Sequence, residues 1–177
     1  MGVKLKCTGF ALFCAVWMVQ GARAENCRLS LSQSRIDYGV VHREALLESP
    51  SVTLGSRTLH LNVLCAEPSA IALRFIGAAD GRGFRFGQQG RLRLSLKHAR
   101  MDGRAVDWAL AHLPGEAARG QLLPGQVLVA GAVGKRLTAQ VDVDTDVPAD
   151  TFQVRYQTVL ESQGSFELVS PAVPLSR

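Results

Sequence analysis

The stretch "RLRLSLK" from Arg91 to Lys97 alternates polar and apolar residues without a break. Successive side chains of an extended chain point to opposite faces, so Leu92, Leu94 and Leu96 share one face. This pattern predicts a β-strand with one side buried.

The same period of two, or a run of strand-forming residues, recurs on both sides of this stretch. The segments concerned are 29–31, 59–63, 71–76, 105–110, 127–133, 137–143, 152–160 and 165–169. Together with 91–97 they predict about nine strands. No stretch of ten or more residues after the N-terminal segment holds a helical period. Short strands of this kind predict an all-β fold, and specifically a β-sandwich.

The intervals between these segments carry turn residues. They read "GAADGRG" from Gly77, "MDGR" from Met101, "LPGE" from Leu113, "LPGQ" from Leu123 and "ESQG" from Glu161. Glycine and proline favour turns because they adopt or fix particular backbone angles. The pair Asp102-Gly103 predicts a two-residue β-hairpin turn.

Residues 1–24 have the composition of a secretory signal peptide. Lys4 and Lys6 precede an apolar run from Phe10 to Val19, and Ala22-Arg23-Ala24 provides the cleavage motif. The apolar run is too short to span a bilayer. We therefore expect cleavage after Ala24, export, and a soluble mature protein of one domain, residues 25–177, without a membrane span.

Charge gives little reason to expect a nucleic-acid partner. The signal peptide takes Lys4, Lys6 and Arg23 with it, so the formal net charge of +5 belongs partly to the leader. The remaining basic residues are scattered singly, whereas phosphate binding requires a clustered basic face. No nucleic-acid binding is expected.

The cysteines predict one disulfide. Cys7 and Cys14 leave with the signal peptide, and Cys27 and Cys65 remain. In an oxidising compartment these two have only each other as partners. Their spacing does not match a zinc or redox motif.

No constellation points to catalysis or to a cofactor. The histidines, His42, His60, His98 and His112, are dispersed, and we expect exposed structural roles for them. No nucleophile-elbow or phosphate-loop motif is present. A hydrolase on a β-sandwich therefore has no supporting motif, and we expect a protein that is not an enzyme.

Two segments suggest binding without establishing it. Asp142, Asp144 and Asp146 copy the first spacings of a calcium loop, but Val147 and Gln153 occupy the positions that require glycine and glutamate. We expect a solvated acidic strand there and no metal. The loop "DGRGFRFGQQGR" contains two phenylalanines that either contact a glycan or partner or tuck into the core.

The order of several short motifs carries a family resemblance. Cys27 begins a first strand that "IDYG" ends, "LTL" and "LHLNVLC" lead to Cys65, and "FRFG", "LRLSLKHARMDG", "LLPGQ" and "LESQGSFELV" follow. Over nearly all of the mature chain, this arrangement resembles the fimbrial-like proteins of the Gram-negative chaperone and usher pathway, especially a branch known only as a domain of unknown function.

The resemblance implies an incomplete immunoglobulin-like sandwich that lacks its final strand. In that family a periplasmic chaperone, and then a neighbouring subunit delivered at the outer-membrane usher, fills the groove by strand addition. It implies a Cys27–Cys65 bridge between the first two strands. The groove would be bordered by Leu29 and Leu31 on the first strand and by Phe166 and Leu168 on the last. The mature protein would reach the cell surface as part of a fimbrium.

The chain departs from the family in its first residues. Only Glu25 and Asn26 lie between the expected cleavage and Cys27, whereas a donor extension needs on the order of ten residues. Unless Leu29 and Leu31 themselves act as donor, the protein receives a strand and donates none. This favours the fibre tip. The alternative is a self-complemented secreted or periplasmic β-sandwich that binds a glycan or a protein.

Overall fold

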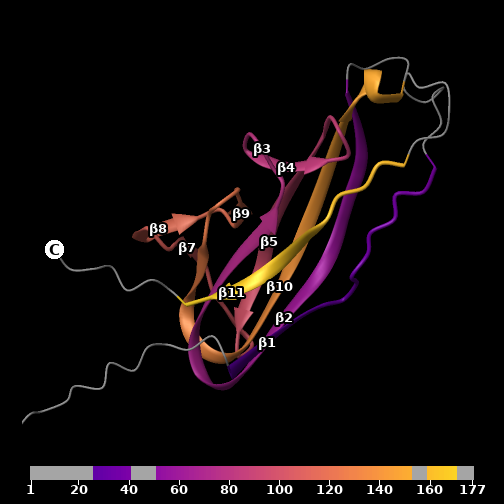
Figure 1. Ribbon diagram of the computed structural model, residues 1–177. Helices are drawn as coiled ribbons and strands as arrows, with labels where there is room; N and C mark the ends of the chain where they lie inside the picture. Colours follow the sequence, from indigo (N-terminus) through magenta and orange to yellow (C-terminus); the bar gives the residue numbers. More distant parts are fainter. Residues whose placement is uncertain (1–25, 41–50, 153–158, 171–177) are drawn as a thin grey trace, which may run out of the picture.

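The computed structural model describes residues 26–40, 51–152 and 159–170 (Figure 1). The expected signal peptide, His42 and the C-terminal tail from Pro171 lie outside these residues. Within them, the chain is built almost entirely of antiparallel β-strands, which confirms the all-β prediction.

The elements follow one another in a simple order. They are β1 (Cys27–Leu31), β2 (Ser51–Gly77), β3 (Ala79–Asp80), β4 (Gly83–Phe86), β5 (Gly90–Met101), β6 (Arg104–Ala105), β7 (Trp108–Leu110), β8 (Leu113–Ala118), β9 (Gln121–Leu122), β10 (Leu128–Pro148), the 3₁₀ helix η3 (Ala149–Phe152) and β11 (Gly164–Val169). In the described part of the chain, no helix is long and apolar enough to cross a membrane.

Two strands are much longer than the sequence pattern indicates. Segments 59–63 and 71–76 belong to the single strand β2, and segments 127–133 and 137–143 belong to β10. The two strands pair antiparallel from Ser51 with Pro148 to Leu64 with Arg136, and again from Ser69 with Gly134 to Leu73 with Leu128. The register shifts between these two parts, where both strands bend (Figure 1). Polar residues at the bends interrupt the alternation in the sequence, so the pattern predicts two separate strands where the structure has one.

The bend divides the sheet into two portions. In the first portion the strand order is β1, β2, β10, β5, β4 and β3. In the second, β11 lies beside the later part of β2, and β7 lies between β10 and β8. The sheet therefore curls, and a single hydrophobic core takes buried residues from both portions, including Leu61 and Val141 from the first and Leu73 and Leu128 from the second.

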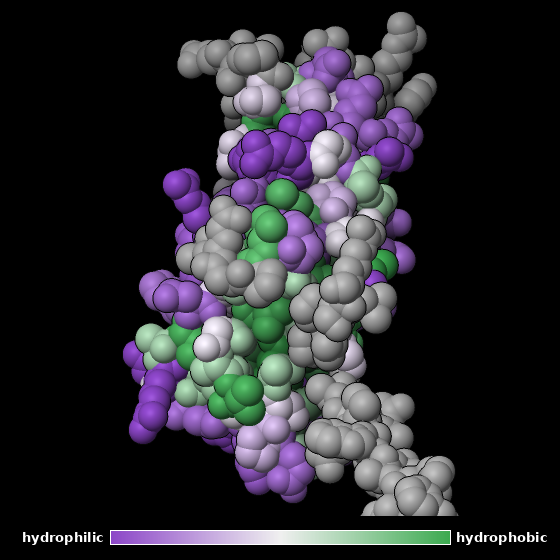
Figure 2. Space-filling view, turned by 90° about the vertical axis from the view of Figure 1, so that its left-hand side faces the viewer, coloured by the Kyte–Doolittle hydropathy of each residue, from purple (hydrophilic) through white to green (hydrophobic). Residues whose placement is uncertain are grey.

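One side of this curled sheet leaves hydrophobic residues at the surface. In the view of Figure 2, hydrophobic residues gather in the middle of the molecule, and hydrophilic residues cover both of its ends. This view faces the side on which β7, β8 and β9 lie in Figure 1. Hydrophobic residues are therefore visible at the surface on this side of the molecule.

Three local predictions require correction. Segment 105–110 is interrupted, because only Ala105 and Trp108–Leu110 are in strands. The "LPGE" sequence lies in β8, and the turn comes just before it, at residues 111–112. Of the expected strand 152–160, Phe152 ends η3, residues 159–160 have no regular structure, and residues 153–158 lie outside the described part of the chain.

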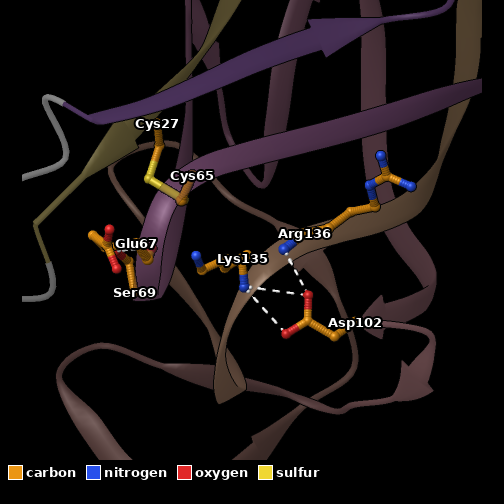
Figure 3. Close-up of a disulfide and its surroundings, with 7 residues drawn as sticks. All are labelled: Cys27, Cys65, Glu67, Ser69, Asp102, Lys135 and Arg136. Atoms are coloured by element: carbon orange, nitrogen blue, oxygen red, sulfur yellow. Dashed lines mark hydrogen bonds between the residues drawn. A yellow bond between two sulfur atoms is a disulfide. The ribbon is translucent and has the colours of Figure 1, made fainter.

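The hairpin turn at Asp102-Gly103 is confirmed. Both residues have positive φ, 49° and 84°, as a type I′ turn requires. The turn joins β5 to β6, with Met101 opposite Arg104. The Asp102 carboxylate accepts hydrogen bonds from the backbone N–H groups of Lys135 and Arg136, at 3.2 and 2.9 Å (Figure 3). The turn therefore supports β10 at its bend.

Candidate functional site

The predicted disulfide between Cys27 and Cys65 is present and links β1 to β2 (Figure 3). The two residues lie opposite each other, and the pairing continues through Leu29 with Val63 and Leu31 with Leu61. β1 is thus paired within its own chain and covalently attached. A strand held in this way is not free to act as a donor to another molecule.

The last described strand, β11, lies along the second portion of the sheet. Phe166 pairs with Phe75, and their rings meet edge to face with centroids 5.0 Å apart. On the opposite face, Glu167 forms an ion pair with Arg74 at 2.8 Å. β11 therefore turns Phe166 toward the core and Glu167 toward solvent.

β1 and β11 are both edge strands in the described part of the chain. Each has one strand partner, β2. The other edge of each has no partner strand among these residues, so it offers a row of backbone donors and acceptors for strand addition.

A cavity of about 1010 Å³ lies beside these two edges. One wall is formed by Leu31 and segment 33–40, and the other by segment 159–164 and Phe166. The floor consists of apolar residues from four strands: Leu54, Leu59, Phe75, Phe86, Leu92, Leu94 and Val143. We call this cavity the groove.

The first wall is fastened to the core by Tyr38. Its hydroxyl lies 2.8 Å from Oγ1 of Thr145, which is fully buried. The Tyr38 ring meets Phe86 edge to face, and the Arg57 guanidinium lies 5.4 Å from its centroid. Asp37 shapes the following turn, because its carboxylate accepts a hydrogen bond from the N–H of Gly39.

The second wall is fastened to β4. The N–H of Gly87 donates to the carbonyl of Glu161 at 3.0 Å, and the Ser162 hydroxyl donates to the carbonyl of Arg85 at 2.6 Å. Leu160 packs against Gly87, which has positive φ and no side chain to obstruct the contact. Both walls are therefore held in place by side-chain or backbone contacts with the sheet.

The groove combines an apolar floor with a mixed rim. Gln33, Ser34 and Arg35 line one side, and Ser162 and Gln163 line the other. Val40 and Val159 are 73% and 79% exposed at the rim, unusually open for large apolar side chains. An extended segment with alternating side chains matches this distribution, because one face contacts the floor and the other meets the solvent.

The structure places only two of the four expected groove residues in the groove. Leu31 and Phe166 line it. Leu29 and Leu168 pack against the core but do not line the groove. The expectation that "IDYG" ends the first strand is wrong, since β1 ends at Leu31 and segment 33–40 has no regular secondary structure. Ile36 and Tyr38 were expected in the first strand, and instead they line the groove.

The acidic segment of β10 is engaged in cross-strand contacts. Asp142 accepts a hydrogen bond from the Thr58 hydroxyl at 2.8 Å and pairs with Lys97 at 2.7 Å. The hydrogen bond from Lys97 holds the pKa of the Asp142 carboxyl below its usual range and the pKa of Lys97 above its own. Asp146 pairs with Arg93 and accepts from Thr53.

No group of three or more potential metal ligands occurs among the described residues. His60, His98 and His112 are exposed, as expected. The phenylalanines of the "FRF" loop, Phe84 and Phe86, are buried, so both fill the core. Phe84 is enclosed in the core, whereas Phe86 also contributes to the floor of the groove.

Comparison with known proteins identifies no relative. No family model, no curated protein and no solved structure matches this chain.

Proposed function

We propose that this protein is a non-enzymatic fimbrial subunit whose groove receives a β-strand from another protein. The groove is the observation that supports this proposal most directly. It is a cavity with an apolar floor beside two edge strands, β1 and β11, and neither strand has a second strand partner among the described residues. Strand addition completes such a sheet through backbone hydrogen bonds and fills the floor with alternate side chains.

The strand arrangement supports an incomplete immunoglobulin-like sandwich. One layer would contain β1, β2, β10 and β5, and the other would contain β11 with the later part of β2 and the earlier part of β10. An immunoglobulin-like domain has one further strand beside the position of β11. The disulfide between the first two strands agrees with the family resemblance.

The proposed assembly follows from the energetics of the open groove. Apolar floor residues and unpaired backbone groups favour aggregation when they face water. A periplasmic chaperone would cover the groove first, and the outer-membrane usher would then exchange it for a neighbouring subunit's strand. The protein would thus be exported through the periplasm to the cell surface, at the fibre tip if cleavage after Ala24 leaves it no donor extension.

Expression in a bacterial periplasm with and without a fimbrial chaperone tests this proposal. We expect soluble protein in complex with the chaperone, and degraded or aggregated protein without it. A stable monomer that unfolds cooperatively without a chaperone would contradict the proposal. That result would support the self-complemented sandwich, which binds a glycan or a protein instead.

A further inference from the structure

The two edge strands beside the groove lie close to each other. Cα atoms of β1 and β11 come within 8 Å of one another. Cys27 lies opposite Cys65 and Val169 opposite Ala72, so these ends of β1 and β11 are the ones nearer the bend of β2. Adjacent strands lie about 4.8 Å apart, so two strands that flank a third are about 9.6 Å apart. A third strand does not fit where β1 and β11 approach.

The groove opens only beyond this point. Leu31, at the end of β1, and Phe166, near the start of β11, line it. Leu29 and Leu168, which lie closer to the bend, pack on the core and do not line it. From Leu31 and Phe166 the lining continues along both walls as far as Val40 and Val159.

We infer that the groove accepts a short strand, which lies between segments 33–40 and 159–166 and stops before the closed end of β1 and β11. This inference rests on the proposed function. The second wall, 159–166, is eight residues long, and an extended segment of about eight residues covers about 26 Å. Such a segment turns about four side chains toward the floor.

The floor defines the chemistry of those side chains. Near the closed end it is aromatic, because the Phe75 ring lies there in contact with the ring of Phe166 on the second wall. Gly77 and Gly164 lie opposite each other, and the Phe75 ring occupies the space that a side chain at either position would need. The ring is therefore confined between these glycines beneath the groove.

Away from the closed end the floor is mainly aliphatic, with Leu59, Leu94 and Val143 beneath the groove. The rim carries hydroxyl, amide and charged groups, including Ser162, Gln163 and Arg35. The partner is therefore an extended peptide segment with aliphatic side chains at alternate positions and polar side chains between them.

Hydrogen exchange with two synthetic peptides, each added to the purified chaperone complex so that it replaces the chaperone, tests the length of the bound strand. The probes alternate valine and lysine and contain eight and twelve residues. We expect both to slow amide exchange within 159–166, to leave 28–30 and 167–169 unchanged, and to bind with affinities within about threefold of each other. Slowed exchange along all of β1 and β11 would contradict the short groove while retaining the proposed function. If neither peptide binds, the short groove and the proposed function are both contradicted.

A matched pair of variants on β11 provides a second test. Phe166→Ala and Leu168→Ala each shorten a side chain that packs on the core, but only Phe166 lines the groove. We expect Phe166→Ala to weaken binding of the eight-residue peptide by roughly tenfold or more and Leu168→Ala by less than about twofold. Equal weakening by the two variants would overturn the inference.

Discussion

The Tyr38 hydroxyl lies 2.8 Å from Oγ1 of Thr145, a residue 107 positions away in the chain. Thr145 occupies an inward position of β10 and is the buried polar side chain of the described core. Tyr38 thereby satisfies a polar group within the apolar interior and fixes one wall of the groove. This contact couples the stability of the fold to the shape of the candidate site.

Replacing Tyr38 by phenylalanine should lower the free energy of unfolding by about 1–3 kcal/mol, because the Thr145 hydroxyl loses its partner in a buried position. Urea unfolding of the protein with its groove filled by the eight-residue peptide, followed by circular dichroism, measures this change and those predicted below. The double variant Tyr38→Phe with Thr145→Val should be more stable than Tyr38→Phe alone, since both polar groups are then absent. A double variant that is less stable than the single one would contradict this role.

The disulfide should leave no free thiol in the exported protein. A thiol reagent should label neither Cys27 nor Cys65 until reductant is added. Replacing both with serine should lower the free energy of unfolding by about 3–4 kcal/mol, since the bond closes a long loop of the unfolded chain. Quantitative labelling of the native protein would show that the bridge does not form.

Asp102 should stabilise the bend of β10 through both its backbone and its carboxylate. We expect Asp102→Ala to cost about 1–2 kcal/mol, because alanine disfavours positive φ and provides no acceptor for the amides of Lys135 and Arg136. Asp102→Asn retains an acceptor and tolerates this conformation, so it should cost less. Equal losses in urea unfolding would contradict this prediction, because Asp102→Asn keeps the acceptor oxygen and the backbone tolerance that Asp102→Ala lacks.

The ion pair between Lys97 and Asp142 should make stability depend on pH in the acid range. The folded-state pKa of Asp142 is depressed, chiefly by the hydrogen bond from Lys97. Its contribution to the free energy of unfolding is therefore fully present above the pKa of the unfolded state. This contribution is lost as the pH falls through the folded-state pKa, below about pH 4. Urea midpoints between pH 7 and pH 2 measure this.

Lys97→Met serves as the control for this pH dependence. It removes the hydrogen-bond donor and should flatten the decrease in stability below about pH 4, while the Thr58 contact with Asp142 remains. An unchanged pH profile in Lys97→Met would assign the acid sensitivity to other carboxylates.

The order of assembly depends on where the signal peptide is cleaved. N-terminal sequencing of the exported protein should begin at Glu25. Immunogold labelling should then find the protein at fibre tips. A neighbouring subunit's extension fused before Glu25 should allow internal incorporation, because strand donation needs a free extended segment. Label along the shaft of unmodified fibres would contradict the tip position.

Local features of the sequence determined the all-β class, the hairpin turn and the disulfide. Alternation such as that of Leu92, Leu94 and Leu96 depends only on the two-residue period of a strand. The turn at Asp102-Gly103 depends on the backbone freedom of two adjacent residues. The pairing of Cys27 with Cys65 depends on there being no other cysteine after the expected signal peptide.

The tertiary structure alone decided where strands bend and where the groove opens. β2 and β10 each continue through a bend because they remain paired with each other on both sides of it, and no local pattern reports such pairing. Leu29 and Leu31 have the same alternation, as do Phe166 and Leu168, yet only Leu31 and Phe166 line the groove. The spacing of β1 and β11 places Leu31 and Phe166 at the groove, and Leu29 and Leu168 outside it. That spacing depends on how residues far apart in the chain pack together.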